Sequence, residues 1–141
     1  MPRYSDADAP IKKADMIPLM LEACPELKPQ WEEFLLEWAD DADLPLYLFI
    51  YVIADHVVGK VDRGESNGLD AVFDVVERWH LEGEHYVREA ATVGFLEGIV
   101  SWEDKHREQQ KILETYFRPE TARYWTKMHN FWNTGAIITD D

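Results

Sequence analysis

Two Glu-x-x-His motifs are the residues of this chain best spaced for metal chemistry. Glu77 and His80 form one motif, and Glu103 and His106 form the other. Residues three apart on a helix project from one face, so each motif directs a carboxylate and an imidazole toward a shared point. Di-iron carboxylate bundles combine two such motifs with one glutamate from each of two further helices. The candidates for those remaining glutamates are Glu33 or Glu37, and Glu89 or Glu97.

The surrounding pattern argues against this di-metal carboxylate site. Both histidines fall within apolar helical stripes, whereas Glu77 and Glu103 fall toward the stripe edges. The motifs are also only 26 residues apart, which leaves room for one helix between them, and ferritin-like bundles normally have longer helices. We therefore expect no metal and no cofactor. His80 and His106 are interpreted as residues at the edge of the core with local hydrogen bonds.

The sequence offers no nucleophile in a recognisable catalytic setting. The serines are Ser5, Ser66 and Ser101, and none has a nucleophile-elbow context. The single cysteine, Cys24, lies beside apolar residues, which is typical of a small core residue; a reactive thiol paired with a histidine is the alternative. No P-loop, dinucleotide glycine fingerprint or CxxC motif is present. The prediction is a protein that is not an enzyme.

Apolar residues recur at helical spacing along most of the chain, with proline near the predicted helix starts and glycine near several ends. Asp43 is expected to cap the third helix, which is apolar nearly all round and therefore buried on most sides. Its β-branched and aromatic residues make a strand the alternative. Helices are expected over about residues 15–23, 29–39, 44–58, 69–82, 84–100, 103–117 and 119–134.

These elements predict an all-α fold: a single compact domain of about seven short helices packed as antiparallel helical hairpins. The domain should span residues 14–134, with a flexible N-terminal arm over 1–13 and a frayed tail over 135–141. Ala90, Gly94 and Gly98 are spaced by four residues and should form a smooth groove that a neighbouring helix can approach closely.

The longest apolar run has 11 residues, from Leu44 to Ala54. A membrane-spanning helix needs roughly 20 residues. The N-terminus is acidic and lacks the apolar core of a signal peptide. We therefore expect a cytoplasmic protein that does not engage a membrane.

The chain carries a formal net charge of −14. Residues 1–45 contain 11 acidic and 4 basic side chains, whereas residues 101–141 contain 7 and 6. Such a charge repels phosphates, so direct nucleic-acid binding is disfavoured. It attracts a basic protein surface and accelerates the encounter with it. Solubility alone is the simpler interpretation of many of these charges.

One segment concentrates acidic residues around a tryptophan, and it is the predicted partner-binding surface. A basic protein that accepts an aromatic side chain would fit it, with Trp38 as the anchor. A solvated helix end followed by an acidic loop is the alternative interpretation. The predicted contact residues are Glu32, Glu33, Glu37, Trp38, Asp40, Asp41 and Asp43.

Three stretches resemble a family of small bacterial helical domains of unknown function. They are residues 79–97 (WHLEGEHYVREAATVGFLE), residues 119–125 (PETARYW) with Phe131 and Trp132, and residues 19–31 with their Cys-Pro and Pro-x-Trp elements. The resemblance covers roughly residues 15–133 and marks helix packing. The family in turn resembles immunity proteins of bacterial toxin systems in size, acidity and single-domain form. The resemblance implies a protein that binds and blocks a toxin domain, often a basic nuclease.

The leading hypothesis is therefore a non-catalytic immunity or inhibitor protein that neutralises a basic toxin or effector through its acidic surface. One alternative is an acidic nucleic-acid mimic that inhibits a CRISPR or other defence effector. Another is a helical adaptor or scaffold without a toxin partner. The di-metal carboxylate protein is the remote alternative.

Overall fold

The protein is an all-helical domain, seen in a computed structural model that describes residues 4–100 and 107–139. Seven helical rods, one of them continuous through α5, η3 and α6, account for most of the described residues. The α-helices are α1 (Met16–Ala23), α2 (Lys28–Glu37), α3 (Leu46–Asp62), α4 (Leu69–Glu82), α5 (His85–Glu89), α6 (Glu97–Ile99), α7 (Arg107–Glu114) and α8 (Pro119–Thr134). Short 3-10 turns, η1 (Lys13–Asp15) and η2 (Pro25–Leu27), flank α1, and η3 (Ala90–Leu96) is π-helical.

The predicted all-α fold of about seven helices is confirmed. The strand alternative for the third helix is wrong, because residues 46–62 form the regular helix α3. Within the described ranges the nearest approach to a sheet is one isolated bridge between Ile11 and Gly83. None of the described helices is both long and apolar enough to cross a membrane.

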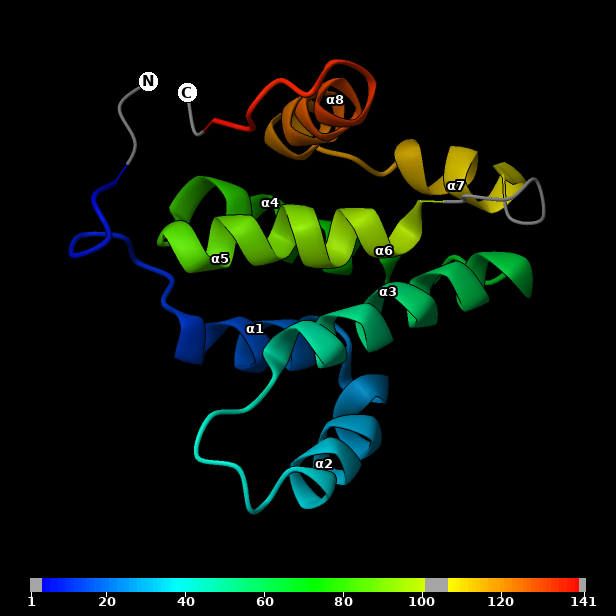
Figure 1. Cartoon of the computed structure of the whole chain (residues 1–141). Helices are drawn as coiled ribbons and strands as arrows, with labels where there is room; N and C mark the ends of the chain where they lie inside the picture. The colour runs from blue at the N-terminus through cyan, green and yellow to red at the C-terminus, as the bar shows by residue number, and fades with distance from the viewer. Residues whose placement is uncertain (1–3, 101–106, 140–141) are drawn as a thin grey trace.

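The continuous rod of α5, η3 and α6 lies across the middle of the molecule (Figure 1). It packs on α3 on one side and on α8 on the other, while α4 contacts α1 and α8. Most side chains in the middle of the rod are buried, and so are the side chains of α3, α4 and α8 that face it. The largest fully buried aromatic residues are Trp79, Tyr124, Phe49, Phe73 and Phe95. Helix α2 stands at the edge of this body and is followed by a long loop (Figure 1).

The two ends of the described chain are attached to the domain. Ile11 is buried in the core, and its backbone N–H donates to the carbonyl of Glu82 at 3.1 Å. Ile138 packs against the core from the other end. Helix α8 ends at Gly135, whose φ of 75° is the left-handed conformation that glycine adopts without strain. The described part of the N-terminal arm, residues 4–13, therefore contributes Ala9 and Ile11 to the packed interior.

The small-residue groove on the central rod receives α3. A Cβ atom placed on Gly94 would lie 2.9 Å from Cγ2 of Ile50, and one placed on Gly98 would lie 2.8 Å from Cβ of Ala54. Both separations are too short for real side-chain carbons, so only glycine permits this approach of the two helices. The groove faces the protein interior, as the spacing predicts.

We expect Gly94→Leu to lower the free energy of unfolding by about 1–3 kcal/mol, because the new side chain must displace Ile50 or shift α3. Urea denaturation followed by circular dichroism measures this loss. Thr126→Leu adds similar bulk at an exposed position of α8 and should change stability by less than about 0.5 kcal/mol. Equal stability of the Gly94 variant and the native protein would contradict the close packing.

Candidate functional site

The inner face of α2 is aromatic and holds the helix against α3. Trp31 and Phe34 stack with ring centroids 5.5 Å apart, and both contact Phe49 of α3, at 4.8 and 5.4 Å. Trp38, one residue after α2, belongs to the same face and lies 6.3 Å from Phe34. The spacing of positions 31, 34 and 38 places these rings on one side of a helix.

The outer face of α2 and the loop after it form a continuous acidic surface, which we call the acidic segment. Glu33, Leu36 and Glu37 share this face because they are three and four residues apart. Leu36 is 79% exposed, with carboxylates on either side of it in the sequence. All six predicted carboxylates are exposed: Glu32, Glu33, Glu37, Asp40, Asp41 and Asp43.

Most of the acidic segment lacks cationic partners. Asp43 lies 3.6 Å from Nζ of Lys13, and its side chain is 94% exposed. Among the ion pairs of the described residues, none involves the other five carboxylates. Five of the six negative charges of the segment are therefore uncompensated at close range by the described part of the chain.

One detail of this region differs from the sequence prediction. Asp43 does not cap α3: the N-cap position is Pro45, without a side-chain hydrogen bond, because the loop continues past Asp43 before the helix starts. Trp38, the predicted anchor, is half-buried against Phe34, and Leu36 is the most exposed of the large apolar side chains of the segment.

The predicted Glu77 and His80 motif serves helix packing. The Glu77 carboxylate accepts hydrogen bonds from the backbone N–H groups of Glu120 and Thr121, at 2.9 and 2.8 Å, and from the Thr121 hydroxyl. It thereby satisfies the first N–H groups of α8, which have no partner within the helix. The second motif, Glu103 and His106, lies outside the described residues.

His80 is fully buried and carries hydrogen bonds on both ring nitrogens. Nδ1 lies 3.0 Å from the carbonyl oxygen of Val76, to which it donates, and Nε2 forms a hydrogen bond with the Thr92 hydroxyl at 3.1 Å. The ring stacks on Tyr124 with centroids 4.8 Å apart. These contacts tie α4 to η3 and α8, as the local hydrogen-bonding interpretation predicts.

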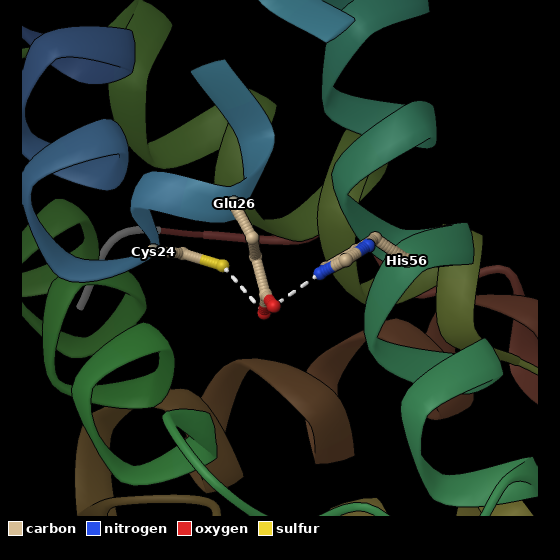
Figure 2. Close-up of side chains that lie close together, drawn as sticks. All are labelled: Cys24, Glu26 and His56. Carbon is tan, nitrogen blue, oxygen red and sulfur yellow. Dashed lines mark hydrogen bonds and ion pairs between the residues drawn. The ribbon is translucent and has the colours of Figure 1, made fainter. Parts of the chain in front are cut away.

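A cluster that the sequence analysis did not predict joins η2 to α3. One carboxylate oxygen of Glu26, Oε1, accepts from the Cys24 thiol at 3.3 Å, from Nε2 of His56 at 3.0 Å and from Nζ of Lys60 at 2.8 Å. Figure 2 shows the Glu26 carboxylate pointing between Cys24 and His56. Lys60 is 2% exposed, whereas the Glu26 side chain is 44% exposed. The cluster is therefore a buried ammonium and thiol covered by a carboxylate that reaches solvent.

The surroundings of this cluster set its protonation. Hydrogen bonds from Lys60 and His56 lower the pKa of Glu26 to about 2, so the carboxylate is ionised at neutral pH. Burial and the adjacent Glu26 raise the pKa of Cys24 to about 12. A thiol in that state is a poor nucleophile, because the thiolate is the reactive form.

Described residues also line small pockets that are open to solvent. One has a volume of about 200 Å³ and lies between the central rod and α8, beside Thr92 and Tyr124. Another, of about 180 Å³, lies between the α3–α4 turn and α7, beside Leu69 and Ile112. Sites for drug-sized ligands typically measure roughly 300–1,000 Å³.

The fold and this surface define a small helical domain with an acidic, protruding helix. A family model described as "Domain of unknown function (DUF7674)" matches residues 17–133, and the chain belongs to this family. The expected membership in a family of unknown function is confirmed. No curated protein and no solved structure matches the chain.

Proposed function

We propose that this protein is a non-catalytic inhibitor of the immunity-protein type, which binds and neutralises a basic toxin or effector domain through the acidic segment. The observation that carries the proposal is the set of exposed carboxylates around Leu36, five of which have no ion pair with a described residue.

The charge arrangement supports a basic protein partner. Like charges held close together on one helix and its adjoining loop repel one another, and a basic surface relieves that repulsion when it binds. The same field accelerates association with a cationic partner. An exposed leucine among the carboxylates adds an apolar contact, which gives a binding surface affinity beyond that of charge alone.

The state of the thiol supports a function without catalysis. Cys24 is the single cysteine of the chain, and burial beside a carboxylate keeps it protonated. The buried imidazole of His80 has its two nitrogens engaged by Val76 and Thr92. Both groups stabilise the fold in their present positions.

The test is a pull-down of the tagged full-length protein from its native host, with mass spectrometry of the proteins that remain bound. We expect one stoichiometric basic partner, released by raised salt because screening weakens contacts between exposed charges. Inhibition of that partner's activity by the purified protein would establish the inhibitor function.

Two outcomes would contradict the proposal. A monomer that captures no partner under toxin-expressing conditions would exclude a constitutive complex. A partner that DNA displaces from the complex competitively would instead identify a nucleic-acid mimic, because the acidic segment would then occupy a phosphate-binding groove.

A further inference from the structure

We propose that Cys24, Glu26 and His56 form a zinc-binding site between η2 and α3, with the Lys60 ammonium occupying the place of the cation when zinc is not bound. The proposal does not depend on the inhibitor function.

The three side chains carry the ligand atoms that zinc prefers. Thiolate sulfur, imidazole nitrogen and carboxylate oxygen are its usual protein ligands, and three of them with a water molecule complete a tetrahedral site. Sγ of Cys24, Nε2 of His56 and a carboxylate oxygen of Glu26 all lie within 4.8 Å of one another. Other groups of His, Cys, Asp and Glu in the described residues do not meet this spacing.

Two of the three distances between ligand atoms are close to those of a tetrahedral zinc site, and the third, from Sγ of Cys24 to Nε2 of His56, is within 4.8 Å. Tetrahedral bonds of about 2.0–2.3 Å separate neighbouring ligand atoms by about 3.3–3.6 Å. Oε1 of Glu26 lies 3.3 Å from Sγ of Cys24 and 3.0 Å from Nε2 of His56. Zinc would therefore replace two existing hydrogen bonds, with small movements of side chains that already converge (Figure 2).

Zinc binding requires that Sγ of Cys24 and Nε2 of His56 give up the protons that they donate to Glu26 in the metal-free protein. Coordination displaces the Cys24 thiol proton to solvent, and the imidazole binds through Nε2 in the tautomer that carries its proton on Nδ1. Glu26 is half exposed, so an ion and a fourth, water ligand can reach the site from solvent.

Lys60 makes the site distinctive. Its ammonium is 2.8 Å from the same carboxylate oxygen and is 2% exposed, so it neutralises Glu26 in the metal-free protein. Oε2 of Glu26 has no hydrogen bond to any described residue, which leaves an oxygen to which Lys60 can move when Oε1 binds a metal. The lysine charge should nevertheless weaken zinc binding, because two cations then share one small site.

The test is titration of the reduced, chelator-treated full-length protein with Zn²⁺ by calorimetry and with Co²⁺ by absorbance. We expect one zinc per chain and a thiolate-to-cobalt charge-transfer band, which reports Cys24 because it is the single cysteine. Cys24→Ser and His56→Ala should each weaken zinc binding by more than about 100-fold, beyond the loss from a second-shell contact. Lys60→Met should strengthen it by about tenfold.

His85→Ala is the matched control, because His85 is an exposed histidine on α5, outside the proposed site. It pairs with Glu89 of the same helix at 3.1 Å. The variant should bind zinc as the native protein does. If the Cys24 variant fails to fold, the cobalt band of the native protein still reports thiolate ligation. The proposal is wrong if native and Lys60→Met proteins both fail to bind stoichiometric zinc, if the cobalt complex lacks the thiolate band, or if the His85 variant loses as much affinity as the His56 variant.

Discussion

Changing Asp40, Asp41 and Asp43 together to lysine should weaken binding of the partner by at least about 100-fold, because six units of charge change on one contact surface. All three carboxylates are exposed, and the pair that Asp43 forms with Lys13 is a surface contact. Exposed pairs contribute little to stability, so the variant should unfold within about 1 kcal/mol of the native protein. Surface plasmon resonance with the captured partner, together with urea denaturation, measures both quantities.

The matched control changes the same net charge elsewhere. Glu22, Asp55 and Glu108 are exposed on α1, α3 and α7, outside the acidic segment, and their reversal to lysine should lower only the association rate, mostly at low salt. Leu36→Ser should weaken the complex by faster dissociation if the leucine is a central contact. If both triple variants lose the same affinity, the acidic segment is not the contact surface.

The helical architecture could be predicted because local signals and packing agree. Pro119 and Gly135 bound α8, since proline suits the first turn of a helix and glycine suits the left-handed residue after its end. The stripe of Ala90, Gly94 and Gly98 indicated close helix contact, which α3 supplies. The π-helical stretch within this rod carried no sequence signal, because it depends on how the rod packs against its neighbours.

The loop before α3 shows where local signals fail. Asp43 precedes an apolar helix at a spacing suited to a cap, yet the chain turns tightly at Pro45, where the N–H of Leu46 donates to the carbonyl of Leu44 at 2.8 Å, before α3 begins. A proline disfavours helical conformation in the residue before it, which keeps Leu44 outside the helix. The capping prediction ignored this restriction.

The acidic segment was visible in the sequence, and the structure adds Leu36 to the apolar residues that it exposes. Trp38 follows the inner stripe of Trp31 and Phe34, so its half-burial is consistent with helical spacing. The same spacing places Leu36 on the outer face with Glu33. A helical projection of residues 28–38 would have distinguished the two residues.

The cluster around Glu26 could not have been predicted in the same way. Glu26 and His56 are 30 residues apart in the sequence, and they meet because η2 packs beside α3. A buried lysine in an apolar helix was the one indication, because an ammonium in that setting requires an anionic partner.

Glu26→Gln should lower the free energy of unfolding by about 2–4 kcal/mol, because it leaves the buried Lys60 ammonium without its carboxylate. The expected loss is below that of a fully buried pair, since the Glu26 side chain is 44% exposed and water can partly replace it. Urea denaturation in metal-free buffer at neutral pH measures the change. Lys60→Met removes the charge and keeps the apolar stem, so it should change stability by less than about 1.5 kcal/mol.

The double variant decides whether the buried charge causes the loss. Glu26→Gln in the Lys60→Met background should cost about 1 kcal/mol or less, because no buried cation then remains unpaired. Equal losses in both backgrounds would show that Glu26 acts through Cys24 or His56 instead.

The acid dependence of stability gives an independent measure of the same interaction. The pKa of Glu26 is lowered from 4.5 to about 2 in the folded protein, so the unfolded chain binds more protons between these values. The stabilisation from Glu26 is therefore complete above about pH 5 and is lost as the pH falls through 4.5 toward 2. The difference in unfolding free energy between the native protein and Glu26→Gln should shrink over this interval. A difference that stays constant from neutral pH to pH 2 would mean that the ionised carboxylate is not what stabilises the cluster.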